Sequence, residues 1–499
     1  MSRERARTYP VPDRWSYLWL AIGTVLSLFP SGRWPIPLAA WLGPVFMVRF
    51  MRTQKVFRGF ILVWLATYVT AVIAWWGMMP SSLPLPANLV ILAISTLTIL
   101  GPSYLADRLL APRLKGFAAT LVFPLALTAM DYLSATFSPI GSFGAQAYTQ
   151  YGNLALMQLL SITGMWGLTF LVSWFASVAN WAWERSFGWP AIRRGAALYA
   201  GIMLLVMAYG SARLVFSPAQ AGTVRVAGLT VVDPDELIAS ADGKEALRRL
   251  TSDVRDRYME QTIREARAGA KIVLWPEGAG LGFEEDEAAL IARGKEVAAQ
   301  EGIYLAMPLF TIYETPGRLP ENKLIVAGPA GDIVLEHQKY GAGLLEGIQP
   351  GDRVLRTFNS PFGTISGIIC WDADFPATVR QAGRNGTDIL LVPSNDTREI
   401  DPMHTQMAVF RAIENGVSLV RQASGGLSIV ADPYGRVLAG MDHFTASEWA
   451  MVAQVPTQGV FTVYSVIGDL FGWLALAGFA AIIAWVLVRR RGARRPESP

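Results

Sequence analysis

Long apolar runs dominate the first 212 residues of the chain and return once near its end. Most of them are long enough to cross about 30 Å of hydrocarbon as helices. The first two are short and separated by a proline-flanked loop, so they could form one re-entrant pair, although we favour two short or tilted spans. The pattern predicts eight membrane helices, at residues 15–29, 36–48, 59–78, 88–106, 117–137, 159–182, 196–212 and 470–488.

Between the seventh and eighth apolar runs, strand-like and helix-like segments alternate as in an ordinary water-soluble domain. Helical spacing of apolar and charged residues predicts helices at 245–268, 286–300, 377–384 and 404–415. Apolar, β-branched runs predict strands at 223–232, 271–275, 303–312, 364–370, 388–392, 418–422, 426–431 and 436–438, with a hairpin of 322–328 and 332–338 turning at Gly331. Strands separated by helices and hairpins predict layered sheets covered by helices.

The composition shifts at the same places and predicts three regions. Only 16% of the residues are charged, whereas about a quarter is usual in a soluble protein. The deficit lies mostly before residue 213. We therefore expect a transmembrane bundle at 1–216, a water-soluble domain at 217–466, and a last membrane helix with a basic tail at 467–499.

The net charge of +4 hides a division along the chain. Residues 217–469 hold 22 Lys+Arg against 33 Asp+Glu, and the rest of the chain holds 21 against 6. The basic excess lies in short segments that flank the apolar runs. It therefore gives no reason to expect nucleic acid as a partner, and membrane topology accounts for it better.

Basic residues alternate from loop to loop along the predicted spans. One side would carry 19 Lys and Arg, and the short loops of the other side only Arg33. The positive-inside rule then places both termini in the cytoplasm and 213–469 outside it. The N-terminal pattern could also be a cleaved signal peptide. Because no small-residue cleavage site follows it before Phe29-Pro30, a retained first helix is the better interpretation.

The chain has a single cysteine, Cys370, and three histidines that do not cluster in the sequence. An intramolecular disulfide is therefore impossible, and the pattern argues against a zinc site. We expect no metal and no cofactor. The bland interpretation of Cys370 is a chance buried thiol.

Three predicted strands end in a reactive side chain, where α/β sheets present their ligands. Glu277 follows Trp275-Pro276, Lys339 closes the hairpin, and Cys370 ends an apolar strand. Taken singly, a surface glutamate, a solvated lysine and a structural thiol are all reasonable. Together they supply complementary chemistry, because an ammonium lowers the pKa of a thiol and stabilises an oxyanion while a carboxylate moves the proton.

Two histidines offer a different arrangement. His404 or His337 could pair with Cys370 as in papain-like enzymes. Neither histidine ends a predicted core strand, so this pairing is the less favoured alternative.

At the three strand ends the chain resembles the nitrilase (carbon–nitrogen hydrolase) superfamily, and its fusion to a helical bundle resembles one branch, the bacterial apolipoprotein N-acyltransferases. Further motifs carry the resemblance across nearly the whole chain: Trp41-Leu-Gly-Pro44, the run 158–170, Tyr464-Ser-Val-Ile-Gly-Asp469, Asn395-Asp396, Arg411-Ala-Ile-Glu414 and Arg421-Gln-Ala-Ser-Gly425. The resemblance implies an α+β fold, an αββα nitrilase-like sandwich inserted in an eight-helix transmembrane bundle of seven helices plus one.

The resemblance also implies roles for individual residues. Glu277 would be the base, Lys339 the stabiliser of oxyanion and thiolate, and Cys370 the nucleophile. Glu346 resembles the family's second glutamate. The chain reads Cys370-Trp371-Asp372 where the family has Cys-Tyr-Glu, and it lacks the family's Gln-x-Asn after the first domain strand. We expect Glu346, Trp371 and Asp372 to bind substrate or to support the site, and these departures concern the acceptor more than the reaction type.

The implied reaction transfers a fatty acyl chain from a membrane phospholipid, through a Cys370 thioester, to the N-terminal amine of a diacylglyceryl-cysteine lipoprotein. The implied location is the bacterial inner membrane, with the catalytic domain on the periplasmic side. A membrane-anchored amidase or nitrilase that uses water as acceptor is a second hypothesis. A transporter or scaffold with a vestigial triad is a third, although Asp131 is the only clear carboxylate inside a predicted span.

Overall fold

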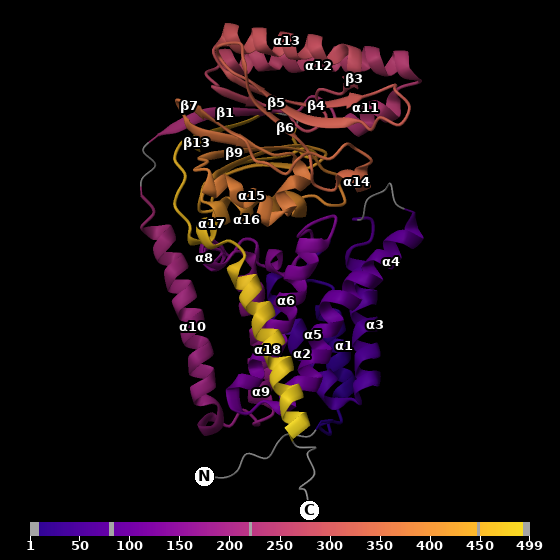
Figure 1. The fold of residues 1–499 in the computed structure, drawn as a ribbon, viewed down its shortest axis with the longest axis vertical. Helices are drawn as coiled ribbons and strands as arrows, with labels where there is room; N and C mark the ends of the chain where they lie inside the picture. Colours follow the sequence, from indigo (N-terminus) through magenta and orange to yellow (C-terminus); the bar gives the residue numbers. More distant parts are fainter. Residues whose placement is uncertain (1–8, 79–83, 219–221, 447–449, 493–499) are drawn as a thin grey trace, which may run out of the picture. The chain divides into compact units, whose positions relative to one another are not determined.

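The computed structural model describes residues 9–78, 84–218, 222–446 and 450–492. The chain divides into two compact units (Figure 1). The first consists of Met1–Phe137, Gly144–Arg213 and Asp469–Pro499, and the second of Ser138–Phe143 and Leu214–Gly468. The second unit thus includes a six-residue piece of the N-terminal half.

The first unit is a helical bundle (Figure 1). Five helical stretches among the described residues are long and apolar enough to cross a membrane: Val56–Ala74, Leu85–Arg113, Gly116–Phe137, Trp189–Val215 and Leu470–Arg489. The first, fourth and fifth stretches correspond to α3 (Val56–Ala74), α10 (Trp189–Val215) and α18 (Leu470–Gly492). The second is made of α4 (Leu85–Ser95), η1 (Thr96–Leu100), α5 (Gly101–Leu110) and η2 (Ala111–Arg113). The third is made of η3 (Gly116–Leu121) and α6 (Val122–Phe137).

The three remaining predicted spans also form helices, but these are shorter or less apolar. Residues 15–29 contain α1 (Ser16–Leu26), of 11 residues, and 36–48 begin α2 (Pro37–Thr53), of 17 residues. Residues 159–182 hold α8 (Leu160–Thr163) and α9 (Met165–Trp183), and α9 buries the polar Asn180. The count of eight spans stays a prediction.

Polar groups inside the bundle are paired across helices. Asp131 on α6 accepts hydrogen bonds from the Thr169 hydroxyl on α9 at 3.1 Å and from the Gln146 N–H at 3.3 Å. Arg52 on α2 forms a bidentate ion pair with Asp107 on α5, with N–O distances of 2.7 and 2.8 Å. Both carboxylates therefore hold helices together, which is the use that buried polar groups most often have in a membrane bundle.

Two mixed sheets form the second unit. The first has the order β13-β1-β2-β4-β5-β6, and β3 pairs with the end of β4. Its strands are β13 (Ala450–Pro456), β1 (Thr223–Leu229), β2 (Ile272–Leu274), β3 (Gly282–Phe283), β4 (Tyr304–Ile312), β5 (Glu321–Ala327) and β6 (Ile333–Gln338). The second sheet, β12-β11-β10-β9-β8-β7, is built from β7 (Thr357–Ser360), β8 (Gly363–Gly367), β9 (Ile389–Asn395), β10 (Ser418–Ser424), β11 (Leu427–Ala431) and β12 (Val437–Asp442).

The two sheets pack face to face and helices cover their outer faces (Figure 1). Side chains such as Ile272, Leu324 and Ile389 fill the core between the sheets. A second core packs α12 (Lys244–Arg267) and α13 (Glu284–Glu301) against the first sheet, and α15 (Pro376–Arg384) and α16 (Met403–Asn415) cover the second. These four layers make the αββα sandwich of the nitrilase superfamily.

The predicted helices and strands of this unit are present, with ends shifted by a few residues. The hairpin turn has Gly331 at a φ of +77°, a conformation that glycine adopts without strain. Several strands are shorter than predicted, and one of the differences concerns the site. The strand expected at 364–370 ends at Gly367, and Cys370 instead opens the 3₁₀ helix η5 (Cys370–Asp374).

Several short elements were not predicted: α11 (Pro234–Ser240), β3, β7, α14 (Gly343–Glu346), β13 and α17 (Val463–Ile467). They lack a strong local pattern. The strand β13, for example, owes its place to its antiparallel pairing with β1.

Candidate active site

Glu277 and Lys339 lie at the same edge of the first sheet. Glu277 comes three residues after the end of β2, and Lys339 directly follows β6. Because β4 is parallel to β2 and β5 is antiparallel to both β4 and β6, the strands β2 and β6 run in the same direction. Their carboxyl ends therefore meet at one edge, which explains how residues far apart in the sequence come together.

Lys339 is the centre of a buried ion cluster. Its Nζ atom donates to Oε1 of Glu277 at 2.7 Å and to both carboxylate oxygens of Glu346 at 2.6 and 2.8 Å. The lysine side chain is only 2% exposed. Burial lowers the pKa of Lys339, but the charges of Glu277 and Glu346 outweigh it and raise this pKa well above its usual value. The ammonium therefore stays charged at neutral pH.

Glu277 is fixed by three donors. Besides Lys339, the Asn322 side-chain amide donates to Oε1 at 2.7 Å, and the backbone N–H of Asn395 donates to Oε2 at 2.9 Å. Asn322 belongs to the first sheet and Asn395 ends β9 in the second. The carboxylate is thus held between the two sheets in one orientation.

Cys370 lies near this cluster in a strained backbone conformation. It has a φ of +47°, which costs a residue other than glycine about 1–3 kcal/mol. Its thiol is buried and donates to the carbonyl oxygen of Asn395 at 3.8 Å. Burial and the charge of Glu277 raise the pKa of Cys370, while Lys339 and His404 lower it. Strain of this kind is typical of a side chain presented for chemistry.

Glu346 and Asp372 both support the lysine, in different ways. Glu346 ends the single-turn helix α14, and its side chain remains 28% exposed. Asp372 is fully buried and accepts from the backbone N–H groups of Tyr340, Gly341 and Ile369, at 3.0, 2.6 and 2.9 Å. Asp372 therefore ties the segment after Lys339 to the segment before Cys370.

Trp371 packs beside the site rather than into its ion cluster. Its ring lies edge-on to Phe143, with the centroids 5.5 Å apart, and tilted against His404 at 5.7 Å. Phe143 belongs to the piece of the N-terminal half that joins the second unit. The aromatic pair makes an apolar surface next to Cys370.

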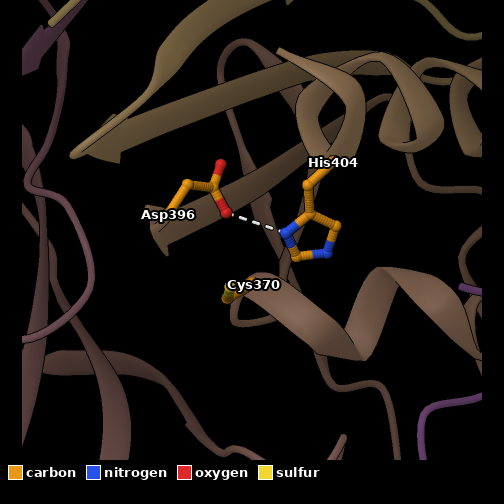
Figure 2. Close-up of side chains that lie close together, drawn as sticks. All are labelled: Cys370, Asp396 and His404. Atoms are coloured by element: carbon orange, nitrogen blue, oxygen red, sulfur yellow. Dashed lines mark hydrogen bonds and ion pairs between the residues drawn. The ribbon is translucent and has the colours of Figure 1, made fainter. Parts of the chain in front are cut away.

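The structure also reveals a charged cluster that the sequence did not indicate. His404 lies beside Cys370 (Figure 2), with Nδ1 at 2.7 Å from Asp396 and Nε2 at 2.8 Å from Asp374. Arg421 donates to both oxygens of Asp396 at 3.0 Å. Burial lowers the pKa of His404, but Asp396 and Asp374 raise it well above its usual range. His404 is therefore protonated, and both of its ring nitrogens donate to carboxylates.

This arrangement does not suit the papain-like pairing. A histidine that takes the thiol proton needs a free nitrogen, and both nitrogens of His404 are engaged. His337 binds Asp372 at 2.8 Å through Nε2 instead.

One ligand atom each of Cys370, Asp396 and His404 could meet at a metal ion, since the three lie within 4.8 Å of one another. Arg421, however, already neutralises Asp396, so the contacts describe an ion-pair cluster.

Comparisons with known proteins find relatives of both units. Two family models match the chain, Apolipoprotein N-acyltransferase N-terminal domain over residues 20–178 and Carbon-nitrogen hydrolase over residues 255–460. An apolipoprotein N-acyltransferase of Geobacter metallireducens is 26% identical and the match covers 96% of each chain. One of Bradyrhizobium diazoefficiens is 29% identical over 76% of this chain and 75% of its own.

Among solved structures, an amidase from Nesterenkonia sp. is similar to the second unit at 22% identity. That match covers 48% of this chain and 93% of the amidase, with a TM-score of 0.39, and carries no weight by itself. The two family models and the relative from Geobacter metallireducens are the stronger result. The chain is therefore an acyltransferase, and it is similar to the apolipoprotein N-acyltransferases over nearly its whole length.

Proposed function

We propose that this protein moves a fatty acyl chain from a membrane phospholipid to the N-terminal amine of a diacylglyceryl-cysteine lipoprotein, with Cys370 as the covalent carrier. The observation that carries the proposal is a set of contacts at Asn395. Its N–H donates to Glu277, which also accepts from Lys339, and its carbonyl oxygen accepts from the Cys370 thiol. The relatives' name, apolipoprotein N-acyltransferase, supports the acceptor.

In the first step, Glu277 takes the Cys370 proton and the thiolate attacks the ester carbonyl of the phospholipid. The Lys339 ammonium faces the negative charge that develops on the carbonyl oxygen, where a fixed cation in a dry site is worth several kcal/mol. The C–O ester bond then breaks. The lysophospholipid leaves with the proton that Glu277 returns, and a thioester remains on Cys370.

In the second step, the acceptor's amine attacks the thioester carbonyl. Glu277 takes a proton from the nitrogen and returns it to the departing thiolate, so that an amide forms and Cys370 is regenerated. No electrons change hands and no cofactor is required for either step. Asp372 acts as a positioning residue, because it holds the backbone on both sides of the reacting groups.

Lys339 has a constraint in this mechanism. All three of its ammonium protons already point at carboxylate oxygens, one at Glu277 and two at Glu346. To meet the oxyanion it must release one contact. Glu346 is the partner that can yield, since it is part-exposed and lies on a four-residue helix, whereas Glu277 is held by two further donors.

The proposed topology follows from the alternation of basic loops. Residues 1–216 would form seven spans, 217–466 the catalytic domain on the periplasmic side of the inner membrane, and 467–499 the eighth span and its cytoplasmic tail. A lipid donor suits this arrangement, because the acyl chain can remain in hydrocarbon while its ester reaches the domain. The apolar face of Trp371 and Phe143 beside Cys370 is suited to the first carbons of such a chain.

The proposal is tested with purified protein, a phospholipid and a synthetic diacylated lipopeptide, followed by mass spectrometry of peptide and protein. We expect N-acylated peptide, lysophospholipid and an acyl group on Cys370, all lost in Cys370→Ala and in Lys339→Ala. Lys323→Ala is the matched control, because Lys323 is also buried and pairs with Glu287 and Glu321 elsewhere in the first sheet.

A second candidate, an amidase that uses water, is favoured by the sandwich alone, since the same triad serves both reactions. Release of free fatty acid or amide hydrolysis, with no transfer to the lipopeptide, would support it. Activity that is indifferent to both substitutions would remove the triad from the mechanism altogether.

A further inference from the structure

A basic cavity lies within the first unit, in the part of the bundle where the helices end in arginine and lysine. Its volume is about 190 Å³. The walls come from the loop Ala111–Gly116, the end of α9, the N-terminal segment and the last helix. It involves no residue of the candidate active site, so whatever it holds is not the reacting ester.

The lining of this cavity has an unbalanced charge. Five of its side chains are basic and one is acidic. The acid, Glu184, accepts from Arg52 at 3.1 Å and from the Tyr9 hydroxyl at 2.7 Å, and Arg52 is further paired with Asp107. This network neutralises one end of the cavity. The excess comes from four other residues, Arg113, Lys115, Arg185 and Arg489.

A buried donor without an acceptor lies in the same wall. Trp181 is 6% exposed, and its indole N–H has no hydrogen-bond partner among the residues that the structure describes. The ring is fixed from two sides, edge-on by Phe117 at 5.1 Å and by the Arg185 guanidinium over its face at 4.3 Å. An orphaned donor in a native structure calls for an explanation, and a ligand with acceptor oxygens provides one.

We propose that this cavity binds the phosphate of an anionic phospholipid headgroup from the cytoplasmic leaflet. A phosphate supplies negative charge for the basic side chains and oxygen acceptors for the Trp181 N–H. The four basic residues belong to loops that the positive-inside pattern assigns to the cytoplasm. Basic pockets between helices on that side are suited to anionic headgroups. The lipid would be a bound structural partner, separate from the acyl donor of the proposed reaction.

The bland alternative is that these arginines only anchor helix ends in the interface. That alternative predicts a diffuse charge effect, equal for any pair of basic residues on the same side. Arg193 and Arg194 provide the comparison, since both are exposed at the start of α10, belong to the same set of loops, and lie outside the cavity lining.

The test is native mass spectrometry of the delipidated full-length protein, titrated with phosphatidylglycerol or with phosphatidylcholine of the same acyl chains. We expect one phosphatidylglycerol to bind in preference. The double variant R113Q/K115Q should weaken this binding about 30-fold, given about 1 kcal/mol for each basic residue near an anionic lipid. R193Q/R194Q should leave it within about threefold of the parent.

W181F keeps an aromatic six-membered ring and removes the five-membered ring of the indole with its N–H. It should weaken phosphatidylglycerol binding by about tenfold or more, as the loss of one hydrogen bond to a charged group, and it serves as the second variant if R113Q/K115Q does not fold. Equal losses in R113Q/K115Q and R193Q/R194Q would overturn the site, as would equal binding of the two lipids. Full competition by millimolar inorganic phosphate would overturn the lipid as the occupant.

Discussion

The Lys339 ammonium nitrogen lies 2.7 Å from Oε1 of Glu277, although the two residues are 62 positions apart in the chain. Each is almost wholly buried, and the contact joins the ends of two strands of one sheet. Isolated charges at such depth would be strongly unfavourable, whereas a paired and hydrogen-bonded cluster is tolerated. The pair therefore places a carboxylate and an ammonium together in a dry site near the only sulfhydryl of the chain.

Substitution of Glu277 by Gln should abolish thioester formation at Cys370 while leaving most of the geometry intact. The amide oxygen can still accept from Lys339 and Asn322, whereas the NH2 group loses the hydrogen bond from the Asn395 N–H and cannot take up the thiol proton. General-base contributions of this kind are about 10²–10⁴-fold in rate. The measurement is the rate of Cys370 acylation by phospholipid, followed by mass spectrometry of the intact protein.

Glu336→Gln is the matched control for this variant, because Glu336 is an exposed glutamate on β6, the strand that leads to Lys339. It should acylate at the parent rate. A Glu277→Gln protein that acylates within tenfold of the parent would remove Glu277 as the base.

Substitution of Glu346 by Gln should move the alkaline limb of the acylation rate to lower pH. Glu346 is one of the two carboxylates whose charge raises the pKa of Lys339, while burial opposes them. Without that charge, burial lowers the pKa of Lys339, so the ammonium loses its proton at a lower pH. The positive charge that stabilises the oxyanion is then lost at that lower pH as well. The measurement is the pH profile of single-turnover thioester formation in the variant and the parent.

Glu314→Gln serves as the comparison, since Glu314 is an exposed partner of Lys244 and does not contact Lys339. Its profile should match that of the parent. An unchanged alkaline limb in Glu346→Gln would mean that this carboxylate does not set the charge state of Lys339.

Substitution of His404 by Gln should raise the pKa of the Cys370 thiol. Burial raises this pKa, and His404 is one of two neighbouring cations that lower it. Without the imidazolium, a smaller fraction of Cys370 is thiolate at a given pH. The rate of alkylation by iodoacetamide, measured across pH, should therefore rise at higher pH in the variant than in the parent.

His443→Gln is a suitable control, because His443 follows β12 and packs against Phe444 rather than Cys370. Because alkylation reads the thiolate directly, a purely structural role of His404 would lower the amplitude without moving the midpoint. That outcome would contradict electrostatic support of the thiolate by His404.

Local patterns predicted the strand ends well. Glu277 and Lys339 each follow a short apolar strand closed by a turn, so their positions are visible in the order of residues alone. The shared direction of β2 and β6 is the added step that brings them together. The sequence predicts Cys370 at the end of its strand. The turn of η5 and the positive φ of Cys370 come from the surrounding packing, and no local pattern predicts them.

The His404 cluster shows what local patterns leave out. Its members come from η5, the segment after β9, α16 and β10, so their meeting depends entirely on the tertiary fold. One signal was available: Arg421 lies within the strand predicted at 418–422, and a charge in a buried strand requires a partner. The identity of that partner could not be read from the sequence, because Asp374 and Asp396 are two of many acids in the domain.

Substitution of Asp396 by Asn should destabilise the catalytic domain strongly. Asp396 is buried between Arg421 and His404, and its loss leaves both cations with less compensation. Removing one partner of a buried pair costs about 3–5 kcal/mol, which corresponds to a fall in Tm of about 6–20 °C for a domain of this size. Asp352→Asn is the control, because Asp352 pairs with Arg356 at the surface and is 52% exposed, where such pairs are worth about 0–1 kcal/mol.

The same cluster determines in which direction the stability of the catalytic domain changes with pH. Burial raises the pKa of Asp396, but Arg421 and His404 outweigh it and lower this pKa below its usual value. A lowered folded-state pKa gives stability that is present above the unfolded value of about 3.9 and is lost as the pH falls toward the folded one. Thermal unfolding of the parent should therefore move to lower temperature below about pH 4, and Asp396→Asn should flatten this dependence. Equal slopes in parent and variant would show that other carboxylates govern the acid limb.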